Sequence, residues 1–194
     1  LMDGFEITLV GKKEIIEKEL SKYDFSQERI KIEPASEIID MNDSPARALR
    51  QKKDSSLSVG SNLVSEKKAE GFISAGNTGA VMAAGLFNIG RLSGIKRPSI
   101  STVLPAENGE TLLMDAGANT DTGPENLLQF AVMGKIYAEK ILGISNPRLG
   151  LLSIGEESKK GNDLVKNTYP LLEDDARIDN FIGNVEGRDI FTSD

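Results

Sequence analysis

Three segments of the chain combine glycine with polar side chains at spacings suited to anion binding. The first is Ser74-Ala-Gly-Asn-Thr-Gly-Ala80, in which two glycines three residues apart separate an expected strand from an expected helix. Glycine lets the backbone approach a ligand closely, and a helix N-terminus presents unpaired N–H groups to an anion. The segment therefore predicts a phosphate cradle. It lacks the GxGxxG pattern and the lysine of a P-loop, and a tight turn with close helix packing would explain its glycines equally well.

The second segment, Asp115-Ala-Gly-Ala-Asn-Thr-Asp-Thr-Gly-Pro124, begins where another expected strand ends. Its carboxylates could hold Mg²⁺ or orient a bound group, because hard cations prefer oxygen ligands. Asp and Asn residues also cap helices and shape turns, and the pattern alone favours that structural role.

The third segment, Gly155-Glu-Glu-Ser-Lys-Lys-Gly-Asn162, places Lys159 and Lys160 beside Gly161 at the expected start of a helix. A lysine at this place can neutralise phosphate or a developing oxyanion. Either lysine taken alone fits a solvated charged loop. Ligands of parallel α/β sheets bind beyond the carboxyl ends of the strands, so three such loops together favour a binding site.

A local basic patch lies in Arg47-Ala-Leu-Arg-Gln-Lys-Lys53. In a helix, Arg47, Arg50 and Lys53 would share one face at three-residue spacing. Such a patch suits an acidic partner or a phosphate-bearing ligand, and a solvated helix face is the alternative.

The composition narrows the chemistry that these segments can perform. The 194 residues include no Cys and no His, which excludes disulfides, thiolate nucleophiles, Cys-ligated zinc and Ser–His–Asp triads. Lys and Arg number 23 and Asp and Glu number 30, giving a net charge of −7. This balance argues against nucleic-acid binding. No apolar run is long enough for a transmembrane helix. No cofactor is expected and no metal site is assigned, although a magnesium site built from carboxylates stays possible.

The elements that must position these residues alternate between strands and helices. Strands are expected over residues 5–11, 29–33, 71–75, 100–104, 111–115, 148–154 and 180–182. Helices are expected over residues 12–23, 45–53, 57–68, 78–91, 124–142 and 162–172. Ser44 and Pro45 suit the start of the second helix, and Asn108-Gly109 indicates a hairpin turn. The alternation predicts a single α/β domain over residues 1–194, with a mainly parallel sheet and one antiparallel hairpin.

Longer motifs in the sequence resemble those of a known protein family. They are Ile73-Ser-Ala-Gly-Asn-Thr-Gly-Ala-Val-Met-Ala-Ala-Gly-Leu-Phe87, Leu113-Met-Asp-Ala-Gly-Ala-Asn119, Gly150-Leu-Leu-Ser-Ile-Gly155 with Lys159-Lys-Gly-Asn162, and Phe181-Ile-Gly-Asn-Val-Glu-Gly-Arg-Asp189. The chain resembles the PlsX family of bacterial phosphate acyltransferases through these motifs, in order and without large gaps, from about Phe5 to Asp189. Several long motifs in register are far more specific than a single glycine loop.

The resemblance implies a reaction in which long-chain acyl-ACP and inorganic phosphate give acyl phosphate and acyl carrier protein, for bacterial phospholipid synthesis. It implies a Rossmann-like fold with helices on both faces of the sheet, related to phosphotransacetylases and to isocitrate/isopropylmalate dehydrogenases. It also implies a cytoplasmic homodimer that associates peripherally with the membrane. By the same comparison, the chain lacks the family's opening Asp-Ala-Met-Gly-Gly-Asp segment, and the later Asp-Gly-Phe-Thr-Gly-Asn motif and membrane-contacting helices.

The resemblance also assigns roles to residues. Lys160 matches the family's Lys-Gly motif and is the expected catalytic residue, with Lys159 as the second choice. Phosphate or acyl phosphate is expected to bind at Ser74, Gly76, Asn77, Thr78 and Gly79. The residues expected to line the site are Asp115, Gly117, Asn119, Lys159, Gly161, Asn162, Asn184, Glu186 and Arg188. The patch of Arg47, Arg50 and Lys53 is expected to receive the acidic carrier protein.

Two other functions stay open at the level of sequence. One is a phosphotransacetylase-like enzyme that uses a short acyl-CoA, because these residues do not define acyl-chain length or carrier. The other is a phosphate-binding module without catalysis. A nicotinamide-dependent dehydrogenase fits less well, since the GxGxxG fingerprint and its acidic partner are absent.

Overall fold

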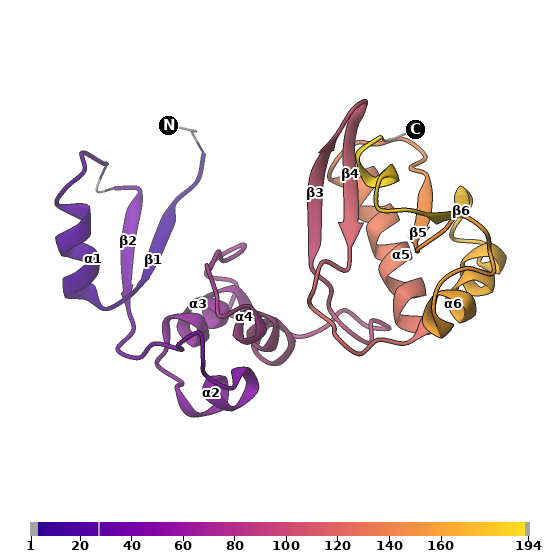
Figure 1. Cartoon of the computed structure of the whole chain (residues 1–194). Coiled ribbons are helices and arrows are strands. Elements are labelled where there is room, and N and C mark those ends of the chain that lie inside the picture. The colour runs from indigo at the N-terminus through magenta and orange to yellow at the C-terminus, as the bar shows by residue number, and fades with distance from the viewer. Residues whose placement is uncertain (1–3, 27, 193–194) are drawn as a thin grey trace. The chain divides into compact units, whose positions relative to one another are not determined.

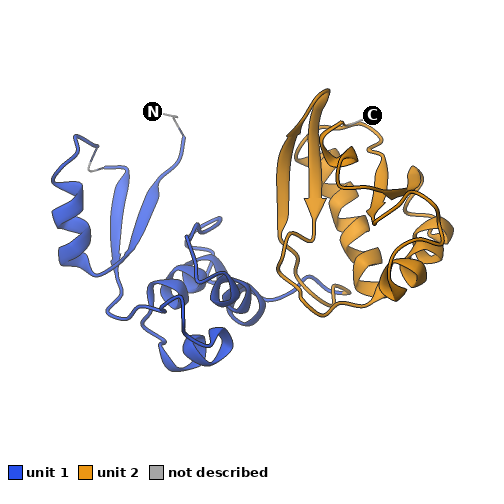
Figure 2. Cartoon of the chain, in the orientation of Figure 1, with its two compact units in different colours: residues 1–93 blue, residues 94–194 orange. Residues whose placement is uncertain are grey.

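The computed structural model describes residues 4–26 and 28–192 of the chain. The chain divides into two compact units, residues 1–93 and residues 94–194 (Figure 2). None of the helices in the described residues combines the length and apolarity needed to cross a membrane.

Unit 1 pairs a small parallel sheet with a group of short helices (Figure 1). Its elements are β1 (Ile7–Gly11), α1 (Lys13–Leu20), β2 (Ile30–Pro34), α2 (Pro45–Gln51), α3 (Ser56–Ser65), α4 (Thr78–Ala84) and a π-helical segment (Gly85–Ile89) that continues α4. β1 and β2 are parallel, with Ile7 opposite Ile30. A side-chain cap begins α3: the Ser55 hydroxyl oxygen accepts a hydrogen bond from the Ser58 N–H group at 3.3 Å.

The core of unit 1 is built mainly from small residues. Its buried members are Ile39, Ala48, Leu49, Leu57, Ala80, Ala83 and Ala84, with Phe72 and Val81 packed against them. Small side chains allow the helices to approach one another closely. The closest approach involves Gly79, where a Cβ atom would lie 2.7 Å from Cγ of Pro45. The beginning of α4 therefore packs directly against the first residue of α2.

Unit 2 places a long helix between a hairpin and a second strand–helix group (Figure 1). Its elements are β3 (Ser101–Ala106), β4 (Gly109–Met114), α5 (Pro124–Lys140), β5 (Leu149–Leu152), α6 (Asp163–Asp174), β6 (Phe181–Val185) and a short 3₁₀ helix (Asp189–Phe191). β3 and β4 are antiparallel, whereas β5 and β6 are parallel. α5 contacts β4 and α6.

The core of unit 2 joins α5, α6 and the β5–β6 pair. Leu172 of α6 is 1% exposed, and Phe130 of α5 is 2% exposed. Tyr169 and Phe181 meet edge to face, with 5.1 Å between ring centroids. β5 and β6 approach so closely that a Cβ atom at Gly150 would lie 2.5 Å from Cγ1 of Val185.

The α/β class and the antiparallel hairpin predicted from the sequence are confirmed. The hairpin turn lies at Glu107–Asn108, one residue before the predicted pair. Ser44 precedes α2 as expected, but its side chain makes no capping hydrogen bond. The prediction of a single domain over residues 1–194 stays a prediction.

The sheet differs from the prediction. The described residues form three separate two-stranded sheets rather than one mainly parallel sheet. The prediction of a strand over residues 71–75 is wrong. No described strand pairs with this segment, and the Ile73 side chain is fully exposed. A strand needs a neighbour for its N–H and C=O groups, and an apolar run does not supply one.

Gly79→Ala is expected to lower the free energy of unfolding by about 1–3 kcal/mol, because the new methyl group has no room beside the rigid ring of Pro45. Gly85→Ala is the matched control. Gly85 has helical backbone angles and open space around its Cβ position, so alanine should be neutral or stabilise by up to about 1 kcal/mol. Urea unfolding followed by far-UV circular dichroism measures both; equal midpoints for the two variants would contradict the close contact.

Candidate functional site

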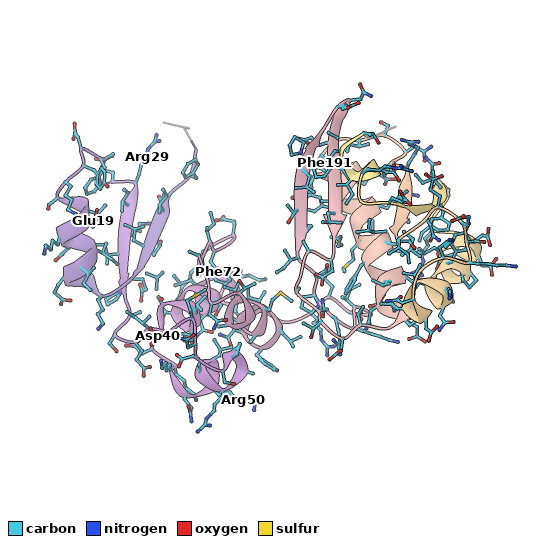
Figure 3. All side chains as sticks on the ribbon, viewed as in Figure 1. Glu19, Arg29, Asp40, Arg50, Phe72 and Phe191 are labelled. Carbon is cyan, nitrogen blue, oxygen red and sulfur yellow. The ribbon has the colours of Figure 1, made fainter. Side chains whose placement is uncertain are left out.

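Asn77 makes most of the side-chain hydrogen bonds of the first glycine-rich segment, residues 74–80. Its side chain is buried, and its Oδ1 atom accepts a hydrogen bond from the Ala80 N–H group at 3.3 Å, which caps α4. Its Nδ2 atom donates to the carbonyl oxygens of Met41 at 3.0 Å and of Asp40 and Asp43 at 3.3 Å each. Asp40 lies in the loop before α2 (Figure 3). The Asn77 amide therefore holds the loop of residues 40–43 against the start of α4.

The rest of this segment offers backbone rather than side-chain groups. Gly76 has a φ of +112°, and its N–H group donates to Oγ of Ser74 at 3.2 Å. Thr78 and Gly79 form the first turn of α4, where N–H groups have no acceptor within the helix. An anion bound here would be held by those N–H groups, since the Asn77 side chain is already engaged.

Asp115 forms a compact cluster at the end of β4. Its Oδ1 atom accepts hydrogen bonds from the Ile100 N–H group at 2.8 Å and the Ser99 hydroxyl at 2.9 Å. Its Oδ2 atom accepts from the Asn119 N–H group at 2.8 Å and from Asn119 Nδ2 at 3.3 Å. Gly117, at a φ of +90°, provides the turn that brings Asn119 back to Asp115.

These bonds also set the charge state of Asp115. Partial burial works toward a higher pKa, but the hydrogen bonds from Ile100, Asn119 and Ser99 outweigh it and lower the pKa of Asp115 below its ordinary value. Asp115 is therefore ionised near neutral pH and accepts bonds from two segments of unit 2. Asn119 adds a further tie, because its Nδ2 atom donates to the Pro98 carbonyl oxygen at 3.0 Å. Among the described residues, no group of three or more acidic side chains is arranged to hold a metal ion.

The loop of residues 155–162 joins β5 to α6 and carries both candidate lysines. The Lys160 N–H group donates to the Glu157 carbonyl oxygen at 2.9 Å. Asn162 then caps α6, its Oδ1 atom accepting from the Val165 N–H group at 3.0 Å. Gly161 has a φ of +92°, and a Cβ atom there would lie 2.7 Å from Cβ of Val165. Only glycine fits between Lys160 and the start of α6.

Two side chains at the end of β6 and just beyond it bind this loop. Asn184 Nδ2 donates to the Glu157 carbonyl oxygen at 2.8 Å. Arg188 forms an ion pair with Glu156 at 3.1 Å and with Glu186 at 3.2 Å. Asn184 and Arg188 thus contact the lysine loop directly, whereas Glu186 contacts Arg188. Their expected role in lining a binding site stays a prediction.

Lys159 and Lys160 are exposed, and within residues 4–26 and 28–192 neither ammonium group has a carboxylate partner. Nearby Glu156 is engaged by Arg188. In the described part of the chain, this loop therefore presents two ammonium groups without a carboxylate partner. Gly161 beside them has no side chain that would block an approaching anion.

The basic patch differs from its predicted form. α2 ends at Gln51, so Arg47 and Arg50 lie on the helix and Lys53 lies in the turn that follows. Lys52 leaves the helical conformation, with φ −95° and ψ +71°, and its Nζ atom donates to Oδ2 of Asp43 at 2.6 Å. The guanidinium of Arg50, labelled in Figure 3, lies 5.5 Å from the ring centroid of Phe87.

The structure brings the predicted residues together in separate groups. Residues 74–79 belong to unit 1, whereas the Asp115 cluster and the 155–162 loop belong to unit 2. No hydrogen bond or ion pair between described residues links the Asp115 cluster to that loop. Sequence reasoning missed Ser99 and the Glu157 carbonyl. Ser99 stands in no motif, and a backbone acceptor has no signature in the sequence.

Comparison with known proteins identifies the family. A family model described as fatty acid synthesis protein matches residues 2–194. Curated proteins named phosphate acyltransferase are also similar: that of Halothermothrix orenii is 61% identical over 189 residues, covering 97% of this chain and 57% of its own length. Those of Clostridium tetani and Heliobacterium modesticaldum are 52% and 54% identical, covering 97% and 96% of this chain and 56% and 55% of their own lengths. The chain spans just over half the length of these relatives. With motifs and family model in agreement over nearly all of its residues, the chain belongs to the PlsX family of fatty acid synthesis proteins.

Proposed function

We propose that this protein is a phosphate acyltransferase that transfers a long-chain acyl group from acyl carrier protein to inorganic phosphate. The support is its membership of the PlsX family, the name shared by its relatives, and the two lysines before Gly161, which have no carboxylate partner among the described residues. The product, an acyl phosphate, would serve bacterial phospholipid synthesis.

The chemistry requires no side-chain nucleophile. A phosphate oxygen attacks the thioester carbonyl carbon, an oxyanion forms, and the C–S bond then breaks to release the carrier thiolate. The new bond is a mixed carboxylic–phosphoric anhydride. The protein needs to bind phosphate, orient it toward the carbonyl and stabilise the negative charge that develops. A chain without Cys and His can do this with lysine and backbone N–H groups.

The observation that carries the proposal is the combination of an exposed side chain and a fixed backbone at Lys160. Its ammonium group has no carboxylate partner in the described residues, its backbone N–H is fixed by the Glu157 carbonyl, and Gly161 follows it. We assign it the stabilisation of the oxyanion and of bound phosphate, with Lys159 as the second candidate. Backbone N–H groups of Thr78 and Gly79 are assigned to phosphate or acyl phosphate. The Asp115 cluster keeps its loops in place.

The proposal extends to partners and location. Acyl carrier protein is the acidic partner proposed for Arg47, Arg50 and Lys53. We also propose that the protein has a Rossmann-like fold related to that of phosphotransacetylases. We further propose that it is a homodimer, and that it is a cytoplasmic protein that contacts the membrane peripherally. These parts rest on the family resemblance.

Lys160→Ala should lower turnover by about a hundredfold or more, the scale of losing one oxyanion donor. The assay follows free carrier thiol from palmitoyl-ACP, with and without inorganic phosphate, using the full-length protein. Lys166→Ala is the control, because Lys166 is exposed on α6 and its removal changes the net charge equally. Equal turnover of the two variants would remove Lys160 from the mechanism.

The same assay separates the rival functions. Phosphate-dependent thiol release from acyl-ACP supports the proposal. Release from short acyl-CoA but not from acyl-ACP would indicate a phosphotransacetylase-like enzyme. Phosphate binding without any thiol release would indicate a binding module.

Arg47→Glu should raise the KM for palmitoyl-ACP by about fivefold at low ionic strength, because reversing a rim charge weakens attraction to an acidic partner. Arg148→Glu is matched in charge and exposure but lies before β5 in unit 2. If both variants raise the KM equally, the effect comes from net charge and the patch has no specific role.

Asp115→Asn should lower the free energy of unfolding by about 1–3 kcal/mol at pH 7, because an amide replaces a carboxylate that accepts four hydrogen bonds. The folded-state pKa of Asp115 is lowered, so its stabilisation is complete above the unfolded pKa of about 4 and is lost as pH falls through the folded pKa. The difference from wild type should therefore shrink on acidification. Asp121→Asn, an exposed position in the same loop, should show no such difference in urea titrations at each pH.

A further inference from the structure

The Glu157 carbonyl oxygen accepts two hydrogen bonds that meet in the loop carrying Lys160. The Lys160 N–H group donates to it at 2.9 Å and closes the turn. Asn184 Nδ2, 27 residues further along the chain from Glu157, donates to it at 2.8 Å. The second bond fixes the turn to β6, an element of the folded core of unit 2.

Asn184 is an unusual residue for its surroundings. It is 4% exposed and stands opposite Leu151 in the β5–β6 register. Its Oδ1 atom is buried without a hydrogen-bond partner among the described residues. Leaving a buried acceptor unpaired is unfavourable, and an apolar side chain of similar size would avoid it. Packing therefore does not account for an asparagine here, whereas the bond that its amide donates to Glu157 does.

A second described contact, between this loop and the residues just after β6, is weaker. Arg188 and Glu156 form an ion pair at 3.1 Å, with both side chains largely exposed. Exposed ion pairs contribute little and are screened by salt. The Asn184 side chain is buried and its bond to the Glu157 carbonyl is partly buried, so solvent and salt weaken this bond less and it can hold the loop in one position.

We propose that Asn184 is a positioning residue that holds Lys160 in its active place through the Glu157 carbonyl. The inference rests on the proposed catalytic role of Lys160. A loop that moves by about 1 Å can lose a hundredfold in rate without losing its substrate. The effect of Asn184 should thus fall on kcat, with substrate binding little changed.

Asn184→Ala should lower kcat by about tenfold to a hundredfold and leave the KM for palmitoyl-ACP within about twofold. The amide hydrogen of Lys160 should exchange about fivefold faster or more, because its turn has lost an anchor. Asn180→Ala is the matched control: Asn180 donates its Nδ2 to the Asn146 carbonyl oxygen at 3.2 Å, just before β6 begins. This variant should change neither kcat nor Lys160 exchange.

Asn184→Asp gives a second readout that a packing role would not produce. When protonated, the introduced carboxyl can donate to the Glu157 carbonyl; when ionised, it cannot donate and repels that oxygen. The kcat of this variant relative to wild type should fall as pH rises. The nearby titratable groups lie in the loop, after β6 and on α6. They are Glu156, Glu157, Lys159, Lys160, Glu186, Arg188, Asp189 and Tyr169. They are common to both proteins, so the ratio isolates the new carboxyl.

The outcomes distinguish this inference from the proposed function. Unchanged kcat together with unchanged Lys160 exchange in Asn184→Ala would overturn the inference, as would a pH-independent ratio for Asn184→Asp. Faster exchange in Asn184→Ala without loss of kcat would also overturn it. If Lys160→Ala retains full turnover, the proposed catalytic role fails instead, whatever the exchange data show.

Discussion

Single Asn and Asp side chains that bond to backbone groups hold the polar loops of this protein in place. Asn77 caps α4 and gathers three carbonyl oxygens from residues 40–43. Asp115 joins two segments beside the hairpin, and Asn162 begins α6. These short side chains reach neighbouring backbone atoms without losing much conformational freedom. Loops rich in glycine would otherwise have little to fix their shape.

This arrangement leaves the two lysine side chains of the 155–162 loop without a carboxylate partner among the described residues. The described bonds that shape the 155–162 loop come from Asn184, Asn162, Arg188 and backbone groups, and none of them uses the ammonium group of Lys159 or Lys160. Catalysis by charge stabilisation benefits from such a division, because a preorganised cation does not have to break a structural bond when negative charge develops. The fold and the proposed chemistry thus draw on different residues of the same loop.

Much of the fold could be predicted from local signals. Pro124 marked the start of α5, Asn162 the start of α6, and the turn near Gly109 the hairpin. Long motifs in register were enough to indicate the family. Local signals failed for residues 71–75, where strand formation depends on a neighbour that an apolar run cannot reveal. Long-range hydrogen bonds such as that from Asn184 to Glu157 could not be predicted from the sequence either, because the acceptor is a backbone carbonyl and every residue has one.

The close approach of β5 and β6 has a consequence for how related sequences can vary. Gly150 leaves no room for a side chain beside Val185, and Val185 directly follows Asn184. A larger residue at position 150 would displace β6 and carry the Asn184 amide away from its acceptor. Substitutions at positions 150, 184 and 185 are therefore expected to be coupled. Across homologues, these positions should change together or stay the same together, although only one of the three carries a polar group.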